Sequence, residues 1–201
     1  EGPAGLFCGL MLARAGYRPL ILERGEAVEE RSRKVAAFWA GGPLDPNSNV
    51  QFGEGGAGTF SDGKLNTLVK DKTGRNRKVL ETFVEFGADP AILYQAKPHI
   101  GTDVLYGIVR SMREEIQRLG GEVRFSSQVT GLILRDGQAG GVLLKSGEAI
   151  SSPAIVLAIG HSARDTFYSL NSQGIPMEPK PFAVGLRIQH PQTMIDLSQY
   201  G

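Results

Sequence analysis

The stretch GPAGLFCGLMLARAGYRPLILE, residues 2–23, decides the fold that the rest of the chain must follow. Gly2 and Gly5 match the last two glycines of a G-x-G-x-x-G turn. Such a turn lets the N–H groups at a helix N-terminus approach a pyrophosphate. Glu23 ends the apolar strand that follows and stands 21 residues after Gly2, where a carboxylate that binds an adenosine ribose is expected. The stretch therefore predicts a turn, a helix and a strand that together bind a dinucleotide.

The strand that carries the first glycine of such a turn would lie before residue 1. Without that strand, the central hydrogen-bonding position of the sheet would be empty. We therefore expect the 201 residues to be an excerpt of a longer protein. Segments upstream and downstream are expected to complete the ligand site.

Composition excludes several classes of protein. The hydrophobic fraction of 41% and the charged fraction of 21% are typical of a soluble globular protein, and a net charge of +1 gives no bulk attraction to nucleic acid or membranes. A single cysteine, Cys8, excludes an internal disulfide framework, and three scattered histidines give no metal-ligand spacing. No apolar run approaches the roughly 20 residues that span a bilayer, and no secretory signal is visible. We expect a cytoplasmic protein without a metal.

Hydrophobic periodicity predicts the remaining elements. Helices are expected at 3–15, 27–40, 79–86, from Thr102 to Gly120-Gly121, and from 167. The first of these has an apolar stripe of Leu6, Leu10 and Ala13, and Thr102 is expected to cap the fourth. The fourth helix has an apolar face that consists of Leu105, Ile108, Val109, Met112, Ile116 and Leu119. Strands are expected at 19–23, 122–129, 132–135, 141–145, 154–159 and 182–188, with turns at Asp136-Gly137 and Ser146-Gly147. The charged residues of the second helix are predicted to form a solvated face: Glu29, Glu30, Arg31, Arg33 and Lys34.

The segment 41–68 is rich in glycine, which leaves its backbone accessible and free to take positive φ. Apolar residues at Phe52, Phe60 and Leu65 argue against the alternative of a flexible linker. We therefore predict a loop that contacts a ligand. The basic segment 70–78 has no aromatic residues that could stack on bases, so a solvated turn is favoured over a nucleic-acid patch.

Six motifs spread over the whole chain resemble one family. They are GPAGL at 2–6, LERG at 22–25, NVQFGEGGAGTFSDGKL at 49–65, KPHIGTD at 97–103, AIGHSARDT at 158–166 and KPFAVGLRIQHPQ at 180–192. The chain resembles the "NAD(FAD)-utilizing" dehydrogenases, within the glutathione-reductase-like flavoproteins. The C-terminal Gly-Asp flavin motif of that family and a second nucleotide fingerprint are absent from the sequence.

The resemblance implies an α/β fold: a Rossmann-like FAD/NAD(P)-binding domain of three layers (β/β/α) with an antiparallel β-meander, over residues 1–178. Residues 179–201 would begin a second, substrate-side domain. The implied function is that of an FAD-dependent oxidoreductase, with hydride transfer through the flavin to or from a small-molecule substrate. NAD(P)H is a candidate reductant, and the oligomeric state is left open.

The resemblance also implies which residues contact FAD. Gly2, Pro3, Ala4 and Gly5 would meet the pyrophosphate, Glu23 would bind the adenosine ribose with Arg24 beside it, Val129 would offer backbone groups to adenine, and Gly160 would pass close to the cofactor. A further group would run along the pyrophosphate, ribityl chain or flavin: Gly55, Gly56, Gly58, Thr59, Ser61, Asp62, Gly63 and Lys64.

Candidate catalytic residues are those that could meet an anionic or carbonyl substrate: His161, Arg164, Lys180, Arg187 and His190. Each has a structural alternative, because His161 and Arg164 could cap or pair near a helix start and the other three could face solvent.

Two other functions stay open. An S-adenosylmethionine-dependent methyltransferase also places a glycine turn before an acidic strand end, although it has no evident use for Gly160 or the glycine-rich loop. A non-catalytic or RNA-associated flavoprotein would use residues 70–78 as its contact.

Overall fold

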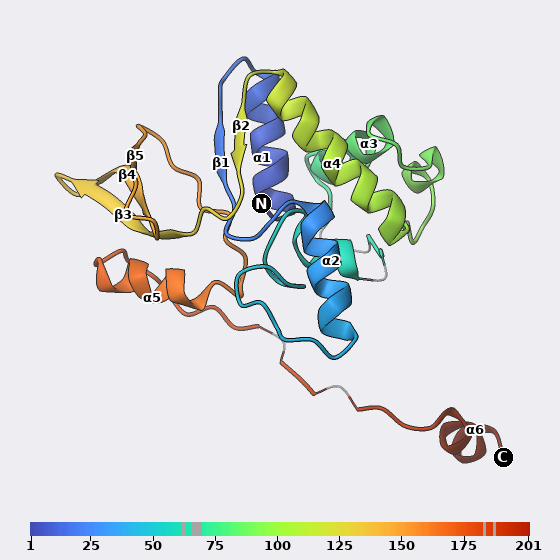
Figure 1. The fold of residues 1–201 in the computed structure, drawn as a ribbon. Helices are drawn as coiled ribbons and strands as arrows, with labels where there is room; N and C mark the ends of the chain where they lie inside the picture. The colour runs from blue at the N-terminus through green and yellow to red at the C-terminus, as the bar shows by residue number, and fades with distance from the viewer. Residues whose placement is uncertain (62, 66–69, 183, 187) are drawn as a thin grey trace.

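The computed structural model of the chain describes residues 1–61, 63–65, 70–182, 184–186 and 188–201. It has a mixed α/β fold with two small sheets, one parallel and one antiparallel (Figure 1). The elements in order are α1 (Pro3–Arg14), β1 (Leu20–Leu22), α2 (Val28–Trp39), η1 (Gly56–Phe60), α3 (Arg75–Glu85), η2 (Pro90–Leu93), α4 (Thr102–Arg118), β2 (Glu122–Arg124), β3 (Val129–Arg135), β4 (Gln138–Leu144), β5 (Ala149–Ser151), α5 (Arg164–Ser172) and α6 (Gln192–Tyr200).

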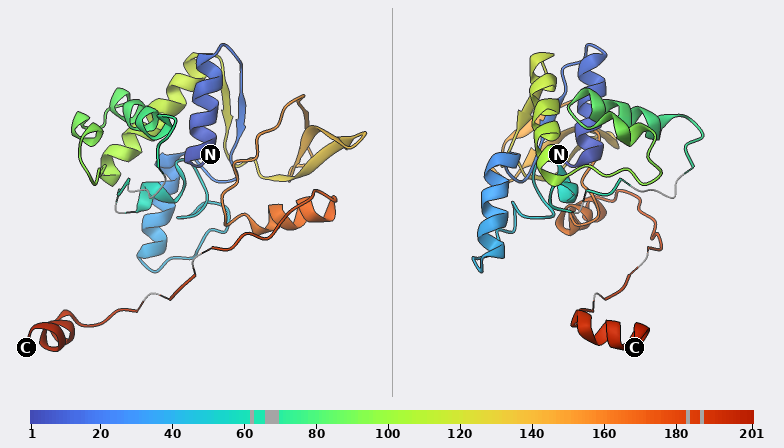
Figure 2. Two further views of the ribbon diagram at one scale, coloured as in Figure 1. Left: turned by 180° about the vertical axis from the view of Figure 1, so that it is seen from behind. Right: turned by 90° about the vertical axis from the view of Figure 1, so that its right-hand side faces the viewer.

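The parallel sheet joins two segments that lie far apart in the sequence. Leu20 pairs with Glu122 and Leu22 pairs with Arg124, so β1 and β2 run side by side. Parallel strands require a crossover connection, which here includes α2, α3 and α4. Both α1 and α4 lie on the same side of this sheet, as the front and back views agree (Figures 1 and 2).

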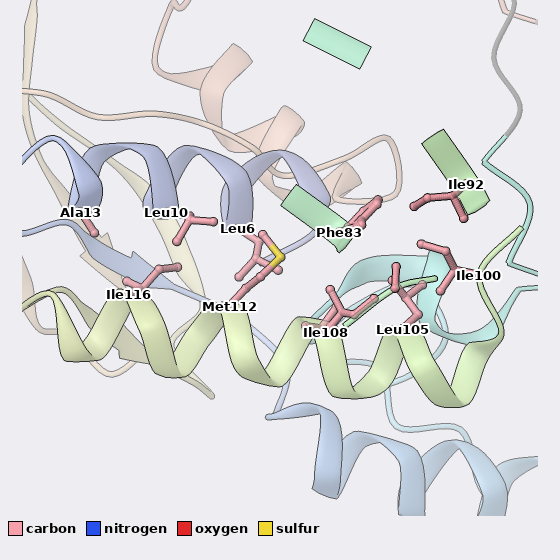
Figure 3. Close-up of a cluster of buried hydrophobic side chains, with 12 residues drawn as sticks. Leu6, Leu10, Ala13, Phe83, Ile92, Ile100, Leu105, Ile108, Met112 and Ile116 are labelled. Atoms are coloured by element: carbon pink, nitrogen blue, oxygen red, sulfur yellow. The ribbon is translucent and has the colours of Figure 1, made fainter. Parts of the chain in front are cut away.

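The core lies where α1 packs against α4 (Figure 3). The predicted stripe of Leu6, Leu10 and Ala13 on α1 is buried and faces α4. Met112 and Ile116 on α4 are completely buried in the same cluster. The apolar periodicity of both helices therefore predicted the core correctly.

The three antiparallel strands follow in the order β3-β4-β5. The turn between β3 and β4 contains Asp136 with φ of 52° and Gly137 with φ of 76°. Positive φ at both central residues is the geometry that joins strands with the native right-handed twist. The predicted Asp-Gly turn and the change from helical to strand periodicity are confirmed.

Two predicted strands are wrong. The segment 154–159 lies opposite β1 across a cavity, and none of its backbone groups between residues 155 and 159 has a hydrogen-bond partner in the described structure. The described residues of 182–188 also form no strand, and Phe182 and Leu186 are almost fully exposed. Both segments have the composition of a strand, but a strand requires a neighbour that accepts and donates hydrogen bonds.

Three helix starts differ from the prediction, and one of them is that of α5, which begins at Arg164 rather than at residue 167. α3 begins at Arg75 rather than at residue 79, because the carboxylate of Asp71 accepts a hydrogen bond from the Arg77 N–H and satisfies the first turn. Thr102 is the first residue of α4 and makes no capping hydrogen bond, so its predicted capping role is wrong. The basic segment around α3 is exposed, as expected.

After α5 the chain leaves the body of the molecule, and α6 lies apart from it (Figures 1 and 2). No residue of α6 is buried. Within the described ranges, no helix has the length and apolar character that crossing a membrane requires.

The packing of α1 on α4 predicts the effect of a core truncation. Met112→Ala should lower the free energy of unfolding by about 2–5 kcal/mol, because it removes buried methylene groups and leaves a cavity. Met11→Ala is the matched control, since Met11 lies on the outer side of α1 with 37% exposure, and it should cost less than about 1 kcal/mol. Urea unfolding of the two variants measures the difference; equal losses would contradict the assigned core.

Candidate functional site

A cavity of about 960 Å³ opens between the N-terminal turn of α1, the strand β1 and the segment 154–160. Its polar border consists of the turn at residues 2–5, the glycine-rich loop at Gly53 and Gly56, the end of β1 and the start of α5. This border is called the polar end below. The rest of the cavity lining is mostly apolar and includes Leu12, Ile21 and the chain from Ala154 to Ile159, with Arg18, Ser151 and Ser152 as polar exceptions. The polar border, and not the volume of the cavity, is the feature that suits a cofactor, because a few polar groups at one place fix the orientation of a ligand.

The two glycine-rich segments touch each other at the polar end. The N–H of Gly55 donates to the backbone carbonyl of Glu1 at 2.9 Å. Gly56 has φ of 65°, and a Cβ atom there would lie 3.0 Å from Pro3 Cδ and 3.2 Å from Gly2 Cα. The absence of side chains at these glycines therefore lets the loop reach the start of α1. By contrast, a Cβ at Gly2 would meet nothing within 4 Å, so that turn faces open space.

The carboxylate of Glu23 connects the end of β1 to the glycine-rich loop. Its Oε1 accepts hydrogen bonds from Gly25 N–H at 2.8 Å and from Gly53 N–H at 3.1 Å. Glu23 is 6% exposed and lines the cavity, so a buried carboxylate stands directly beside the helix N-terminus.

Arg24 closes one side of the polar end. Its guanidinium lies over the ring of Phe52, 4.6 Å from the centroid, and it donates to the carboxylate of Asp165 at the start of α5. Gln128 donates to the same Asp165 oxygen at 2.9 Å. Burial opposes ionisation of Asp165, but the hydrogen bond and charge of Arg24 outweigh it and hold the pKa of that carboxyl below its ordinary value.

The structure brings many of the predicted site residues together around this cavity. The residues that line it are Gly2, Pro3, Ala4, Gly5, Glu23, Arg24, Gly56, Val129, Gly160 and His161. The described residues that do not line it are Gly55, Gly58, Thr59, Ser61, Gly63, Lys64, Arg164, Lys180 and His190. The remaining two, Asp62 and Arg187, lie outside the described residues.

The residues that do not line the cavity lie in the glycine-rich loop and the chain that follows it, at Arg164 in α5, or on the segment that leaves the body. Thr59 is buried behind the loop, where its hydroxyl donates to the Gly56 carbonyl at 2.7 Å. The backbone of Lys64 pairs with that of His99 in an isolated antiparallel β-bridge. Lys180 and His190 are exposed on the segment that leaves the body. Of the described candidates for catalysis, His161 alone borders the cavity.

The predicted solvated face of α2 is wrong for Arg31, which is 0% exposed. Its neighbours on the same face of the helix, Val28 and Val35, are also buried. Arg31 occupies the i+3 position from Val28 and the i−4 position from Val35, which is the spacing of a core stripe. That spacing was the signal in the sequence that could have placed Arg31 in the interior.

A second buried charge, Glu54, supports the start of α2. Its Oε2 accepts from Val28 N–H at 2.7 Å and lies 3.2 Å from the Arg113 guanidinium. Burial raises the pKa of Glu54, while the hydrogen bond from Val28 and the charge of Arg113 oppose the shift. Burial likewise lowers the pKa of Arg31 to about 10, and the charge of Glu54 opposes this. These charges stabilise the loop from behind and do not enter the cavity.

This arrangement suits an elongated ligand with both negative charge and hydroxyl groups. The first N–H groups of α1 have no helical partners and carry partial positive charge at the polar end. Glu23 supplies a hydrogen-bond acceptor next to them. Among the described residues, no group of three or more His, Cys, Asp or Glu side chains could hold a metal ion.

Comparison with known proteins gives one relative and no family. No family model matches the chain. A protein of Clostridium beijerinckii, described only as an uncharacterized protein, is 50% identical over 200 residues, which is 100% of this chain and 37% of the relative. The chain therefore spans little more than a third of the length of the curated relative that it matches.

The contact between Gly53 and Arg31 predicts the effect of an added methyl group. Gly53 has φ of 117°, and a Cβ there would lie 2.4 Å from Arg31 Cδ. Gly53→Ala should therefore lower the free energy of unfolding by roughly 1–2 kcal/mol through backbone strain and by a further ~1–3 kcal/mol through overpacking against Arg31. Gly41→Ala is the matched control, because Gly41 has φ of 94° and open space around it. Urea unfolding should show that Gly53→Ala is the more damaging; equal losses would contradict this geometry.

The pairing of Asp165 with Arg24 predicts a dependence of stability on pH. Because the pKa of Asp165 is lowered in the folded state, its contribution is present above the unfolded pKa of about 3.9 and is lost as pH falls through the folded pKa. The free energy of unfolding of the wild type should exceed that of Asp165→Asn by about 1 kcal/mol or less at pH 7, because the Asp165 side chain is half-exposed and water screens the pair. Unfolding should show the same difference at pH 7 and pH 5 and a smaller one at pH 3, whereas an unchanged difference at pH 3 would contradict the assigned pair.

Proposed function

We propose that the chain is the FAD-binding part of a flavin-dependent oxidoreductase with a Rossmann-like architecture. The observation that carries this proposal is the meeting of separate stretches of bare main chain at one end of a single cavity. Residues 2–5, 53, 56–57 and 160 all border that end, although they come from distant parts of the sequence. An elongated diphosphate with two polyhydroxyl segments is a ligand that requires several separated backbone contacts.

The residues at the polar end fit the adenosine diphosphate half of FAD. The turn at 2–5 would hold the pyrophosphate with the N–H groups that begin α1, since a helix N-terminus favours negative charge. Glu23 would accept hydrogen bonds from the adenosine ribose. Arg24 would lie beside the ribose, with its guanidinium fixed between Phe52 and Asp165.

The open space beside Gly2 and Gly160 supports the same assignment. A Cβ added at either position would meet nothing within 4 Å, and Gly160 has φ of 69°. Glycine at these places leaves room for a ligand to approach the backbone closely. Because the backbone of Gly160 is left-handed, a residue with a Cβ atom would also be strained there.

When bound, FAD would supply the two-electron chemistry, and the chain would bind and orient it. His161 is the candidate to meet a small-molecule substrate, because it follows Gly160 and borders the cavity. The Ser162 hydroxyl lies 3.5 Å from His161 Nε2 and could fix the orientation of the ring. NAD(P)H is a candidate for the reductant.

The proposal is tested by titrating the purified protein with FAD and following flavin fluorescence. The wild type should bind FAD, and Glu23→Gln should weaken binding by about tenfold, because removing the charge weakens hydrogen bonds from the ribose by about 1.4 kcal/mol. Glu30→Gln is the matched control, since Glu30 lies on the surface and pairs with Arg33. The control should bind FAD like the wild type.

The proposal would be overturned if the folded wild type bound no FAD, neither as purified nor after refolding with excess cofactor. Binding of S-adenosylmethionine in place of FAD, measured by calorimetry, would instead identify a methyltransferase. Equal FAD affinity of the wild type and Glu23→Gln would place the cofactor elsewhere on the molecule.

A further inference from the structure

Arg31 is the largest completely buried side chain of the described residues, and it lies behind the glycine-rich loop. It does not border the cavity. The chain from Asn49 to Thr59 wraps around its guanidinium. A buried charge is costly unless hydrogen bonds satisfy it, so its partners define what the residue does.

The guanidinium donates at four places along this chain. Nε donates to the Asn49 carbonyl at 2.8 Å, and one terminal nitrogen donates to the Val50 carbonyl at 3.0 Å. The other terminal nitrogen donates to the Glu54 carbonyl and to the Thr59 hydroxyl, the latter at 3.1 Å. The guanidinium also lies over the ring of Phe60.

One of these bonds sets the direction of a peptide group that reaches the glycine turn of α1. A trans peptide is planar, so its C=O and its N–H point in opposite directions. The Glu54 carbonyl points to Arg31, and the following N–H, that of Gly55, therefore points away and donates to the Glu1 carbonyl at 2.9 Å. Arg31 thus orients the peptide that joins the loop to the turn at Gly2–Gly5.

A second contact acts through Gly53. The aliphatic part of Arg31 fills the space where a Cβ of Gly53 would lie, at 2.4 Å from Cδ. The N–H of Gly53 donates to Glu23, which lines the cavity. Arg31 therefore supports both the acidic residue and the glycine turn without touching the cavity.

We propose that Arg31 is a positioning residue for the cofactor, which rests on the proposed function: its guanidinium fixes the loop so that Glu23 and the turn at Gly2–Gly5 face one ligand. A lysine cannot replace it. Lysine has one nitrogen with three donors, whereas arginine has five donors in a planar fork that can reach several oxygens at once.

The test compares Arg31→Lys with Arg33→Met, a control on the same helix whose side chain is 74% exposed. FAD affinity is measured by calorimetry at a temperature well below the unfolding midpoint of each protein, so that loss of stability alone does not change it. Arg31→Lys should bind FAD at least tenfold more weakly, and the visible circular dichroism of the bound flavin should change. Arg33→Met should match the wild type in both.

A second pair of variants keeps the proposal testable if Arg31→Lys fails to fold. Thr59→Val removes one acceptor of the guanidinium and also the hydroxyl that donates to Gly56. Thr82→Val is its control, because Thr82 is equally buried but lies in α3, where its hydroxyl bonds only to Lys78. Thr59→Val should weaken FAD binding about threefold or more, and Thr82→Val should leave it unchanged.

A measurement without ligand separates this inference from the proposed function. Amide exchange of Gly53 and Gly55, followed by NMR, should become at least tenfold faster in Arg31→Lys and stay unchanged in Arg33→Met. A wild type that binds no FAD would overturn the proposed function, and the exchange rates would then still decide whether Arg31 positions the loop. Unchanged FAD affinity and unchanged exchange in a folded Arg31→Lys would overturn the inference itself.

Discussion

Close contact between stretches of backbone without side chains is the constraint on which the candidate site depends. A Cβ on Gly25 would lie 2.6 Å from the Cα of Gly53, so these two chain segments can approach this closely only because residue 25 is a glycine. Glu23 then accepts hydrogen bonds from both of them through one oxygen. Because Gly56 makes a similar contact with the turn at Gly2–Pro3, three parts of the sequence are fixed around one end of the cavity.

Charged residues behind the loop maintain this arrangement at a cost that their partners offset. Arg31 and Glu54 are both fully buried, and isolated charges in such places would be strongly destabilising. Arg31 is satisfied by backbone carbonyls and the Thr59 hydroxyl, and Oε2 of Glu54 is paired with the first N–H of α2 and with Arg113. The glycines supply flexibility and accessible backbone, and the buried charges remove the flexibility where a fixed wall is required. The same division of roles explains why a loop so rich in glycine has a defined path.

The sequence predicted those features that depend on local patterns. The apolar spacing on α1 and α4 gave the core, and the Asp136-Gly137 turn gave the hairpin. It could not predict features that depend on distant partners. The segment 154–159 has the composition of a strand, but its pairing depends on a neighbour, and a cavity lies there instead. Arg31 was assigned to the surface because charge suggests solvent, whereas its partners come from residues 18 or more positions away.

The most direct measurement is a crystal structure of the protein in complex with FAD. The account predicts that the diphosphate lies against the N-terminal turn of α1 at residues 2–5, and that the adenosine ribose hydroxyls lie within hydrogen-bond distance of the Glu23 carboxylate. It also predicts that the Gly53 and Gly56 contacts remain as they are without ligand. A diphosphate bound at another surface, or a Glu23 carboxylate that does not reach the ribose, would contradict it.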